Sequence, residues 1–271
     1  MAGPKSHPIP SPAKFTLAVG SGKGGVGKST LSLNLALALA EGGAQTGLLD
    51  ADLQGPDIPR MINIARREPI RAWDLWRSRS EGGLRLEPVT NHGVKIMSAG
   101  FLLAEDQALV WDSNLIDLVL RLFLEDVPWG DLDVLVFDLP PGTGEVVQHL
   151  LRRVSLSGAL VVVTPQDVAH LDARKAVTMY RSAGVKVVGG VENMSGLICP
   201  HCGDRVEIFP SVSPERSVWK MGVEQLGRVP MDPGVAVAGD AGRPFLAEHP
   251  NSPSAIALNE IAARLKPLLE G

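Results

Sequence analysis

The chain has few cysteines, few aromatic residues and no long apolar run. Of its 271 residues only two are cysteines, Cys199 and Cys202, and aromatic side chains make up 4%. Two cysteines separated by only two residues cannot link distant parts of a fold by a disulfide. A disulfide framework is therefore excluded, and metal or redox chemistry is favoured. No apolar run approaches the roughly 18 residues of a membrane span, and the amino-terminal residues lack an apolar signal core. We therefore expect a soluble, cytoplasmic protein that does not act at a membrane.

The chain also lacks an excess of positive charge. The net charge is -4 at pH 7, and no block of lysine or arginine stands out, which argues against nucleic acid as a partner. Hydrophobic residues make up 45% of the chain, enough for a large core. Residues 1–14 carry four prolines and little apolar content, so we expect a flexible tail there and a single domain over residues 15–271.

The most informative stretch is glycine-rich and follows a short apolar run. Residues 22–29 fit the phosphate-loop pattern G-x-x-x-x-G-K-[ST], between a candidate strand and a candidate helix at 28–41. Glycines let backbone N–H groups curl around phosphates, Lys28 would bridge the β- and γ-phosphates, and the Ser29 hydroxyl would bind Mg²⁺. The nucleotide-binding residues expected from this loop are Gly22, Lys23, Gly24, Gly25, Val26, Gly27, Lys28, Ser29 and Thr30.

Acidic residues close two apolar runs that read as buried strands. Asp50 and Asp52 follow one run and Asp138 follows the other, at the sheet edge where open α/β folds bind ligands. Carboxylates there can orient Mg²⁺ through water and position the attacking water. On spacing alone Asp50 and Asp52 would suit a solvated loop equally well. The loop at 139–145, with two prolines and two glycines, is expected to act as a γ-phosphate-sensing switch.

Further periodic segments complete an alternation of strands and helices. Asn193 is expected just past the end of a strand at 185–191, where its amide could read the adenine edge, although a turn asparagine fits equally well. The other expected strands are 94–97, 160–164 and 226–231, and the other expected helices are 114–124, 167–182 and 254–269.

Cys199 and Cys202 form a C-x-x-C motif. Two thiolates can converge on one metal centre, but a tetrahedral shell needs four ligands and the chain has no other cysteine. If all the ligands are thiolates, a second copy must supply the other pair, which predicts a symmetric dimer. His201 is an awkwardly placed substitute ligand. A structural zinc at the dimer interface and a redox dithiol are the alternatives, and the dithiol is weaker because the pair sits in a loop.

The motifs together resemble a known family. The form KGGVGKST is similar to the deviant Walker A loop of the MinD/ParA/nitrogenase-iron-protein class, and the whole set resembles the Mrp/ApbC group of iron–sulfur cluster carriers. The matching segments are GSGKGGVGKST, LLDADLQGPDIP, GVKIMSAGFL, VPWGDLDVLVFDLPPGTGE, VVVTPQDVAHLDARKAV, ENMSG with CPHCG, and LGRVPMDP with AGDAGRPF.

The resemblance implies an α/β P-loop NTPase fold with a mostly parallel sheet and helices on both faces. It implies a homodimer that slowly hydrolyses ATP with Mg²⁺, with Lys23 reaching phosphates across the dimer. It further implies a [4Fe–4S] cluster that bridges Cys199 and Cys202 of two subunits, comes from a cluster donor and passes to apoproteins. The residues given catalytic roles are Lys23, Lys28, Asp50, Asp52 and Asp138.

Two other functions stay open from the sequence. One is a MinD/ParA-like positioning ATPase with a structural zinc at the cysteines, and the other is an ATP-driven electron-transfer protein, whose cysteines would lie elsewhere. The chain also departs from the family pattern. Asp57 replaces a usual serine, Asp112-Ser113-Asn114 replaces Arg-Gly-Pro, and Glu145 replaces an aspartate.

Overall fold

The computed structural model describes residues 8–64, 86–102, 112–199 and 201–269. These residues form one nine-stranded sheet with strand order β3-β4-β2-β5-β1-β6-β7-β8, and β9 pairs with β7. All the pairings among β4, β2, β5, β1, β6, β7 and β9 are parallel, whereas β3 and β8 are antiparallel to their neighbours. The strands are β1 Ala13–Ser21, β2 Thr46–Asp50, β3 Val89–Asn91, β4 Val94–Ser98, β5 Leu132–Asp138, β6 Gly158–Val163, β7 Val187–Ile198, β8 Arg205–Val206 and β9 Gln225–Met231.

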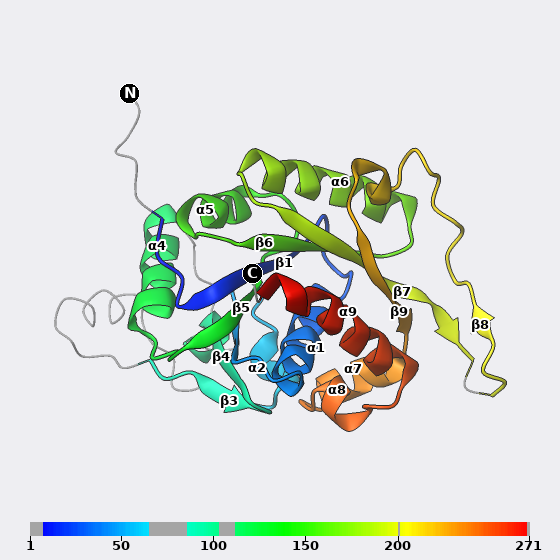
Figure 1. The fold of residues 1–271 in the computed structure, drawn as a ribbon, viewed down its shortest axis with the longest axis horizontal. Helices are drawn as coiled ribbons and strands as arrows, with labels where there is room; N and C mark the ends of the chain where they lie inside the picture. Colours follow the sequence, from blue (N-terminus) through cyan, green and yellow to red (C-terminus); the bar gives the residue numbers. More distant parts are fainter. Residues whose placement is uncertain (1–7, 65–85, 103–111, 200, 270–271) are drawn as a thin grey trace.

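Helices cover both faces of this sheet (Figure 1). Helices α5 and α6 lie on one face, and α1 and α9 pack together on the other. Because both faces are covered, the central strands are continuous apolar runs rather than alternating ones. The helices are α1 Lys28–Glu41, α2 Ile58–Met61, α4 Ser113–Arg121, α5 Glu145–Arg153, α6 Asp167–Ser182, α7 Pro233–Asp240, α8 Phe245–Glu248 and α9 Pro253–Leu269. The expected α/β fold with a mostly parallel sheet and two helical layers is confirmed.

Two short segments extend these elements. A π-helical turn, Leu122–Asp126, continues α4, which completes the helix expected at 114–124. The Ser252 hydroxyl accepts a hydrogen bond from the Ala255 backbone N–H and so caps α9. No helix in the described ranges is both long and apolar enough to cross a bilayer.

The amino-terminal boundary differs from the expectation. Residues 1–7 lie outside the described residues, but Ile9 is only 1% exposed, and its N–H donates to the Arg153 carbonyl oxygen at 2.7 Å. β1 then begins at Ala13. The residues from Ile9 onward therefore belong to the packed domain, because a single isoleucine among prolines finds an apolar site that local composition does not reveal.

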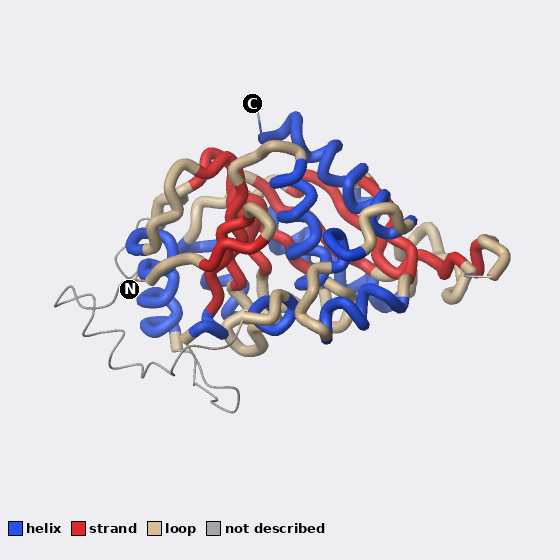
Figure 2. The backbone as a smooth tube through the Cα atoms, turned by 90° about the horizontal axis from the view of Figure 1, so that it is seen from below, coloured by secondary structure: helices blue, strands red, loops and turns tan. Residues whose placement is uncertain are grey.

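β7 is the other departure. It runs to Ile198 instead of stopping at residue 191, so Asn193 lies within the strand and not past its end. Met194 has a φ of 56°, and the pairing with β9 shifts register between Asn193 and Leu197, so the strand is irregular where the sequence suggests a stop. The extension pairs with β8 in a hairpin that projects from the body of the molecule (Figure 2).

Candidate functional site

The phosphate loop lies where the sequence predicts it, between β1 and α1. Gly25 and Gly27 have φ values of 75° and 80°, in the left-handed region that favours glycine. Gly22 has a different constraint, since a Cβ there would lie 2.1 Å from the Asp172 carbonyl carbon in α6. The loop is thus seated closely against α6, and its end leads directly into the first turn of α1.

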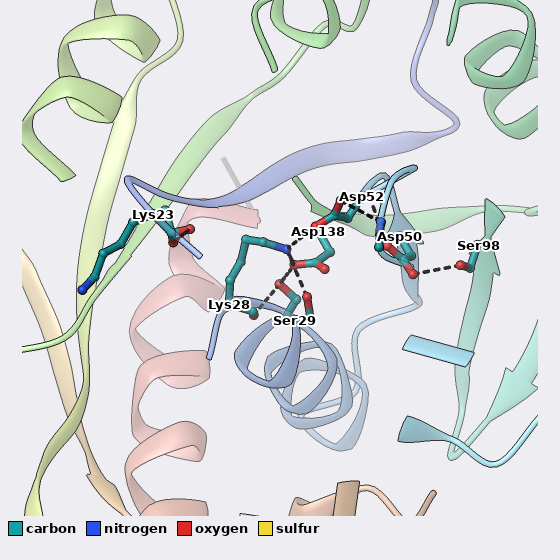
Figure 3. A network of polar contacts seen from close by, with 10 residues as sticks. Lys23, Lys28, Ser29, Asp50, Asp52, Ser98 and Asp138 are labelled. Carbon is teal, nitrogen blue, oxygen red and sulfur yellow. Dashed lines mark hydrogen bonds and ion pairs between the residues drawn. The ribbon is translucent and has the colours of Figure 1, made fainter. Parts of the chain in front are cut away.

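Lys28 lies at the centre of a buried charge cluster (Figure 3). Its Nζ is 2.8 Å from Asp138 Oδ1 and 3.9 Å from Asp52 Oδ2, and it donates to Ser29 Oγ at 3.0 Å. The two carboxylates arrive from the ends of different strands, as parallel strands permit. A phosphate that binds this loop would therefore compete with Asp138 for the ammonium group.

Asp138 is completely buried at the end of β5. Its Oδ1 accepts a 2.7 Å hydrogen bond from Ser32 Oγ, on the first turns of α1. Its Oδ2 is buried without a hydrogen-bond partner among the described residues. An unpartnered carboxylate oxygen in a cluster that also contains the Ser29 hydroxyl fits a Mg²⁺ ion held partly through water. The sequence analysis missed Ser32, whose only signal was its place one helical turn after Lys28.

Asp50 is the second completely buried carboxylate. Ser98 Oγ, at the end of β4, donates to Asp50 Oδ2 at 2.8 Å, and the Asp52 backbone N–H donates to Asp50 Oδ1 at 3.2 Å. Burial and the nearby Asp138 charge raise the pKa of Asp50 well above its usual value. Burial also raises the pKa of Asp52, against the opposing effect of Lys28. Ser98 is a further residue that the sequence analysis did not single out.

Lys23 is the one predicted catalytic residue that does not join this cluster. Its Nζ donates to Gln166 Oε1 at 3.1 Å, and its side chain extends away from Lys28 and the carboxylates (Figure 3). Among the predicted residues, the fold brings together Lys28, Ser29, Asp50, Asp52 and Asp138.

Asn193 reaches the phosphate loop from β7. Its Nδ2 donates to the Val26 carbonyl oxygen at 2.8 Å. Asn193 also lines a cavity of about 700 Å³ beside Gly27 and Thr30. The far walls of this cavity come from the α2 region, including Asp57, and from the loop after β9, around Asp232. Some lining residues belong to the phosphate loop or to α1. Among the others, Asn193 is the one that the sequence analysis expects to contact a nucleotide.

The loop after β5 contacts the phosphate loop directly. The Gly142 N–H donates to the Ser21 carbonyl oxygen at 2.9 Å, and Gly142 has a φ of 82°. α5 begins immediately afterwards at Glu145. The expected role of the loop at 139–145 as a γ-phosphate-sensing switch is compatible with the Gly142–Ser21 hydrogen bond and stays a prediction.

Cys199 and Cys202 lie in the turn of the projecting hairpin between β7 and β8. The Cys199 N–H donates to the Asp204 carbonyl oxygen at 2.8 Å, and the Gly203 N–H donates to the Cys199 carbonyl oxygen at 2.9 Å. Hydrogen bonds from the backbone N–H groups of Cys202 and His201 lower the pKa of the Cys199 thiol, which favours the thiolate. Cys202 is exposed. Within the described ranges no third side chain joins the cysteines to complete a metal site.

Two departures from the family pattern have visible local roles. The Asp112 side chain accepts hydrogen bonds from the N–H groups of Asn114 and Leu115, so it caps α4. Asp57 precedes α2 and lines the cavity described above. Residues 65–85 and Trp111 lie outside the described residues.

Comparison with known families gives one match over nearly the whole chain. The family model described as ParA, NUBPL iron-transfer P-loop NTPase, matches residues 13–266. An iron-sulfur cluster carrier protein of Synechocystis is 43% identical over 253 residues, which cover 93% of this chain and 70% of the relative. The iron-sulfur cluster transfer protein NUBPL of Dictyostelium discoideum is 39% identical over 232 residues, 86% of this chain and 69% of that one.

Several solved structures share this fold. A nucleotide-binding protein from Archaeoglobus fulgidus, in complex with ADP, has a TM-score of 0.71 and 34% sequence identity, and the match covers 90% of this chain and 91% of that chain. The cell division ATPase MinD of Pyrococcus furiosus has a TM-score of 0.70 at 22% identity, with 94% of this chain and 99% of that chain covered. The likeness to MinD concerns the fold alone.

Proposed function

The chain belongs to the NUBPL iron-transfer family of P-loop NTPases, and from that premise we propose that it is an ATP-dependent iron–sulfur cluster carrier. The observation that carries the proposal is the path of β7. This strand holds Asn193 against the phosphate loop and ends at Ile198, one residue before Cys199. A single element thus joins the nucleotide site to the two thiols.

The phosphate loop and its cluster would bind ATP. The glycine-rich loop accommodates the phosphates, and Lys28 exchanges part of its contact with Asp138 for the β- and γ-phosphates. Ser29 Oγ and the unpartnered Oδ2 of Asp138 would hold Mg²⁺, which supplies charge neutralisation on the phosphates. Asp52 faces this point beside Lys28 and would orient the attacking water.

The nucleotide base would occupy the neighbouring cavity. Asn193 carries a donor and an acceptor, and its donor is tied to the Val26 carbonyl oxygen. Its amide oxygen then remains to accept from the exocyclic amine of adenine. The cavity volume of about 700 Å³ is ample for a base and ribose.

The cluster would be the cargo of the projecting hairpin. Cys199 and Cys202 supply two thiolates, and four are needed for a [4Fe–4S] cluster. We therefore infer a homodimer in which two hairpins meet on a two-fold axis and share the cluster. In this arrangement the cluster passes from a donor protein to apo iron–sulfur proteins at an exposed tip. ATP binding draws the subunits together, and β7 transmits that movement to the spacing of the thiols.

The test is metal content after anaerobic reconstitution with iron and sulfide. We expect about four irons and four sulfides per dimer in the wild type, lost in both Cys199→Ser and Cys202→Ser. His201→Ser is the matched control on the same turn, and it should retain the cluster. The loaded dimer should then restore an apo [4Fe–4S] acceptor.

One result would overturn the proposal. If the wild type holds one zinc per dimer and takes up no iron, the hairpin is a zinc clamp on a nucleotide switch. Loss of iron in the His201→Ser control would instead argue against an all-thiolate site.

A further inference from the structure

A second cavity lies against α6, next to Glu192 of β7. Its volume is about 450 Å³, and its walls come from α6, β7, β9 and the chain that returns from the hairpin. α6, β7 and β9 can be followed side by side in Figure 1. The lining is mixed. Its apolar part consists of Trp219, Phe209, Val212 and two prolines, and its polar part consists of His170, Glu192, Arg228, Glu207, Ser211, Ser217 and Gln225.

His170 is completely buried in this wall. Its Nδ1 accepts a hydrogen bond from the Val218 N–H at 3.2 Å, and its ring contacts Trp219 edge-on with centroids 5.7 Å apart. Burial lowers the pKa of His170, against the opposing charges of Glu192 and Asp167, so the ring is neutral at neutral pH. A neutral ring whose Nδ1 accepts must carry its proton on Nε2. That Nε2–H has no hydrogen-bond partner among the described residues.

Glu192 supplies the complementary group. It is 7% exposed, and its Oε1 accepts from Arg228 Nε at 2.7 Å. Its Oε2 lies 3.9 Å from His170 Nε2, beyond hydrogen-bond distance. Between them, His170 and Glu192 thus present one donor and one acceptor, set slightly apart. Arg228 balances the carboxylate of Glu192, and Glu207, the other acidic residue in the lining, pairs with Arg205 at 2.7 Å, so the His170–Glu192 pair offers no net charge to an ion.

These constraints select the chemistry of a ligand. A metal ion is disfavoured because Nε2 holds a proton and not a free lone pair. An anion would be repelled by Glu192, and a cation at Oε2 would be disfavoured by the charge of Arg228 and by the Nε2–H that points to the same place. A carboxamide fits, because its oxygen accepts from Nε2–H while its NH₂ group donates to Oε2. The apolar walls then suit a hydrophobic group attached to that amide.

We propose that this cavity is a binding site for a neutral carboxamide attached to an apolar group, held between His170 Nε2 and Glu192 Oε2. Its position places such a ligand next to two residues that contact the phosphate loop. Glu192 is adjacent to Asn193 in β7, and Gln166, which receives the Lys23 hydrogen bond, lies just before α6. The proposal does not depend on what the cysteines bind.

The test uses four small aromatic probes that share one ring: benzamide, benzyl alcohol, benzoate and benzylammonium. The readout is the ¹⁵N and ¹H resonance of His170 Nε2–H in protein labelled with ¹⁵N-histidine. We expect benzamide to shift this resonance saturably, benzyl alcohol to shift it more weakly, and the two ions to leave it unchanged. A capped peptide amide, N-acetylphenylalaninamide, is the fifth probe. If N-acetylphenylalaninamide binds more tightly than benzamide, the natural ligand is a peptide amide. If it binds more weakly, the natural ligand is a small free amide.

Glu192→Gln keeps the shape of the acceptor and removes its charge, so it should weaken benzamide binding about tenfold, as expected for loss of a charged hydrogen bond. Glu224→Gln makes the same change on an exposed residue outside the cavity and should have no effect. The proposal is overturned if benzamide leaves His170 unmoved, if benzoate binds as well as benzamide, or if both variants bind it alike. Crystals soaked with benzamide that hold only water between His170 and Glu192 would also overturn it.

Discussion

At the scale of single residues, the dominant feature is an excess of buried negative charge around one lysine. Asp50, Asp52 and Asp138 converge on Lys28, and both Asp50 and Asp138 are completely inaccessible. Burial and the Asp138 charge together raise the pKa of Asp50. An ionised Asp50 is thus held at a cost in the nucleotide-free protein, a pattern common where a site is arranged for a ligand and not for stability.

This cost predicts a stabilising substitution. Because the folded state raises the pKa of Asp50, its carboxyl favours folding below the ordinary value of 3.8, and this contribution is lost as pH rises through the folded pKa. Asp50→Asn should therefore stabilise the nucleotide-free protein at pH 8. The gain should be about 0.5–2 kcal/mol, the range of single stabilising substitutions.

Urea unfolding followed by circular dichroism, from pH 4 to 8, measures this difference. The gain should shrink toward zero as pH approaches the ordinary value, and Asp131→Asn, an exposed control, should be neutral throughout. A variant less stable than wild type at pH 8 would mean that the Ser98 hydrogen bond matters more than the charge.

Some of these residues follow from sequence and others do not. The fixed spacing of the phosphate-loop motif predicts the roles of Lys28 and Ser29. Apolar runs that end in aspartate predict those of Asp50 and Asp138. Ser32 and Ser98 carry no such signal, because a serine becomes informative only once the fold aims its hydroxyl at a carboxylate. The outward direction of Lys23 is equally hidden, since it depends on the contact with Gln166.

At the scale of elements, the phosphate loop depends on α6 as its support. A Cβ on Gly22 would lie 2.1 Å from the Asp172 carbonyl carbon and 2.3 Å from the Ala173 nitrogen, both of which are backbone atoms. Backbone cannot move aside as a side chain can. The loop and the helix must therefore separate if residue 22 gains a methyl group.

Gly22→Ala is expected to destabilise the nucleotide-free protein by about 1–3 kcal/mol, the range for forced overpacking. Gly24→Ala is the matched control in the same loop, because the nearest atom to its Cβ would be Pro141 Cβ at 4.0 Å. Thermal unfolding without nucleotide separates the two. Equal melting temperatures for the two variants would show that the loop is not seated on α6.

Regular elements were the most predictable part of the fold. α1 and α6 occupy the residues that the sequence indicates, because a following glycine or a preceding polar residue marks their ends. β7 was predicted too short, since Asn193 and Gly196 resemble a turn while the neighbouring β9 keeps them in the sheet. The two-residue β8 has no periodicity to detect. It forms because the turn that contains Cys199 and Cys202 brings the chain back onto the end of β7.

At the scale of the whole molecule, β1, β2 and β5 end at one edge of the sheet and gather the phosphate loop and the carboxylates there. Lys23 lies at that edge but extends away from its own cluster (Figure 3). A lysine with this orientation beside a phosphate loop is suited to a phosphate bound by a second copy of the chain. The hairpin cysteines call for a second copy independently, so the phosphate loop and the cysteine hairpin predict the same dimer.

Complementation between two inactive variants tests this arrangement. Lys23→Ala keeps Lys28 for its own phosphates but has no lysine for its partner, whereas Lys28→Ala keeps Lys23 and cannot hold its own phosphates. If Lys23 acts across the dimer, a mixed dimer has one complete site, formed by Lys28 of one subunit and Lys23 of the other. Random pairing of equal amounts should then restore about one quarter of wild-type ATP hydrolysis, because about half the dimers are mixed and each has one working site. Phosphate release measured before and after mixing gives the answer directly. If the mixture stays as inactive as its components while sedimentation shows mixed dimers, Lys23 serves its own subunit, and the nucleotide site is complete within one chain.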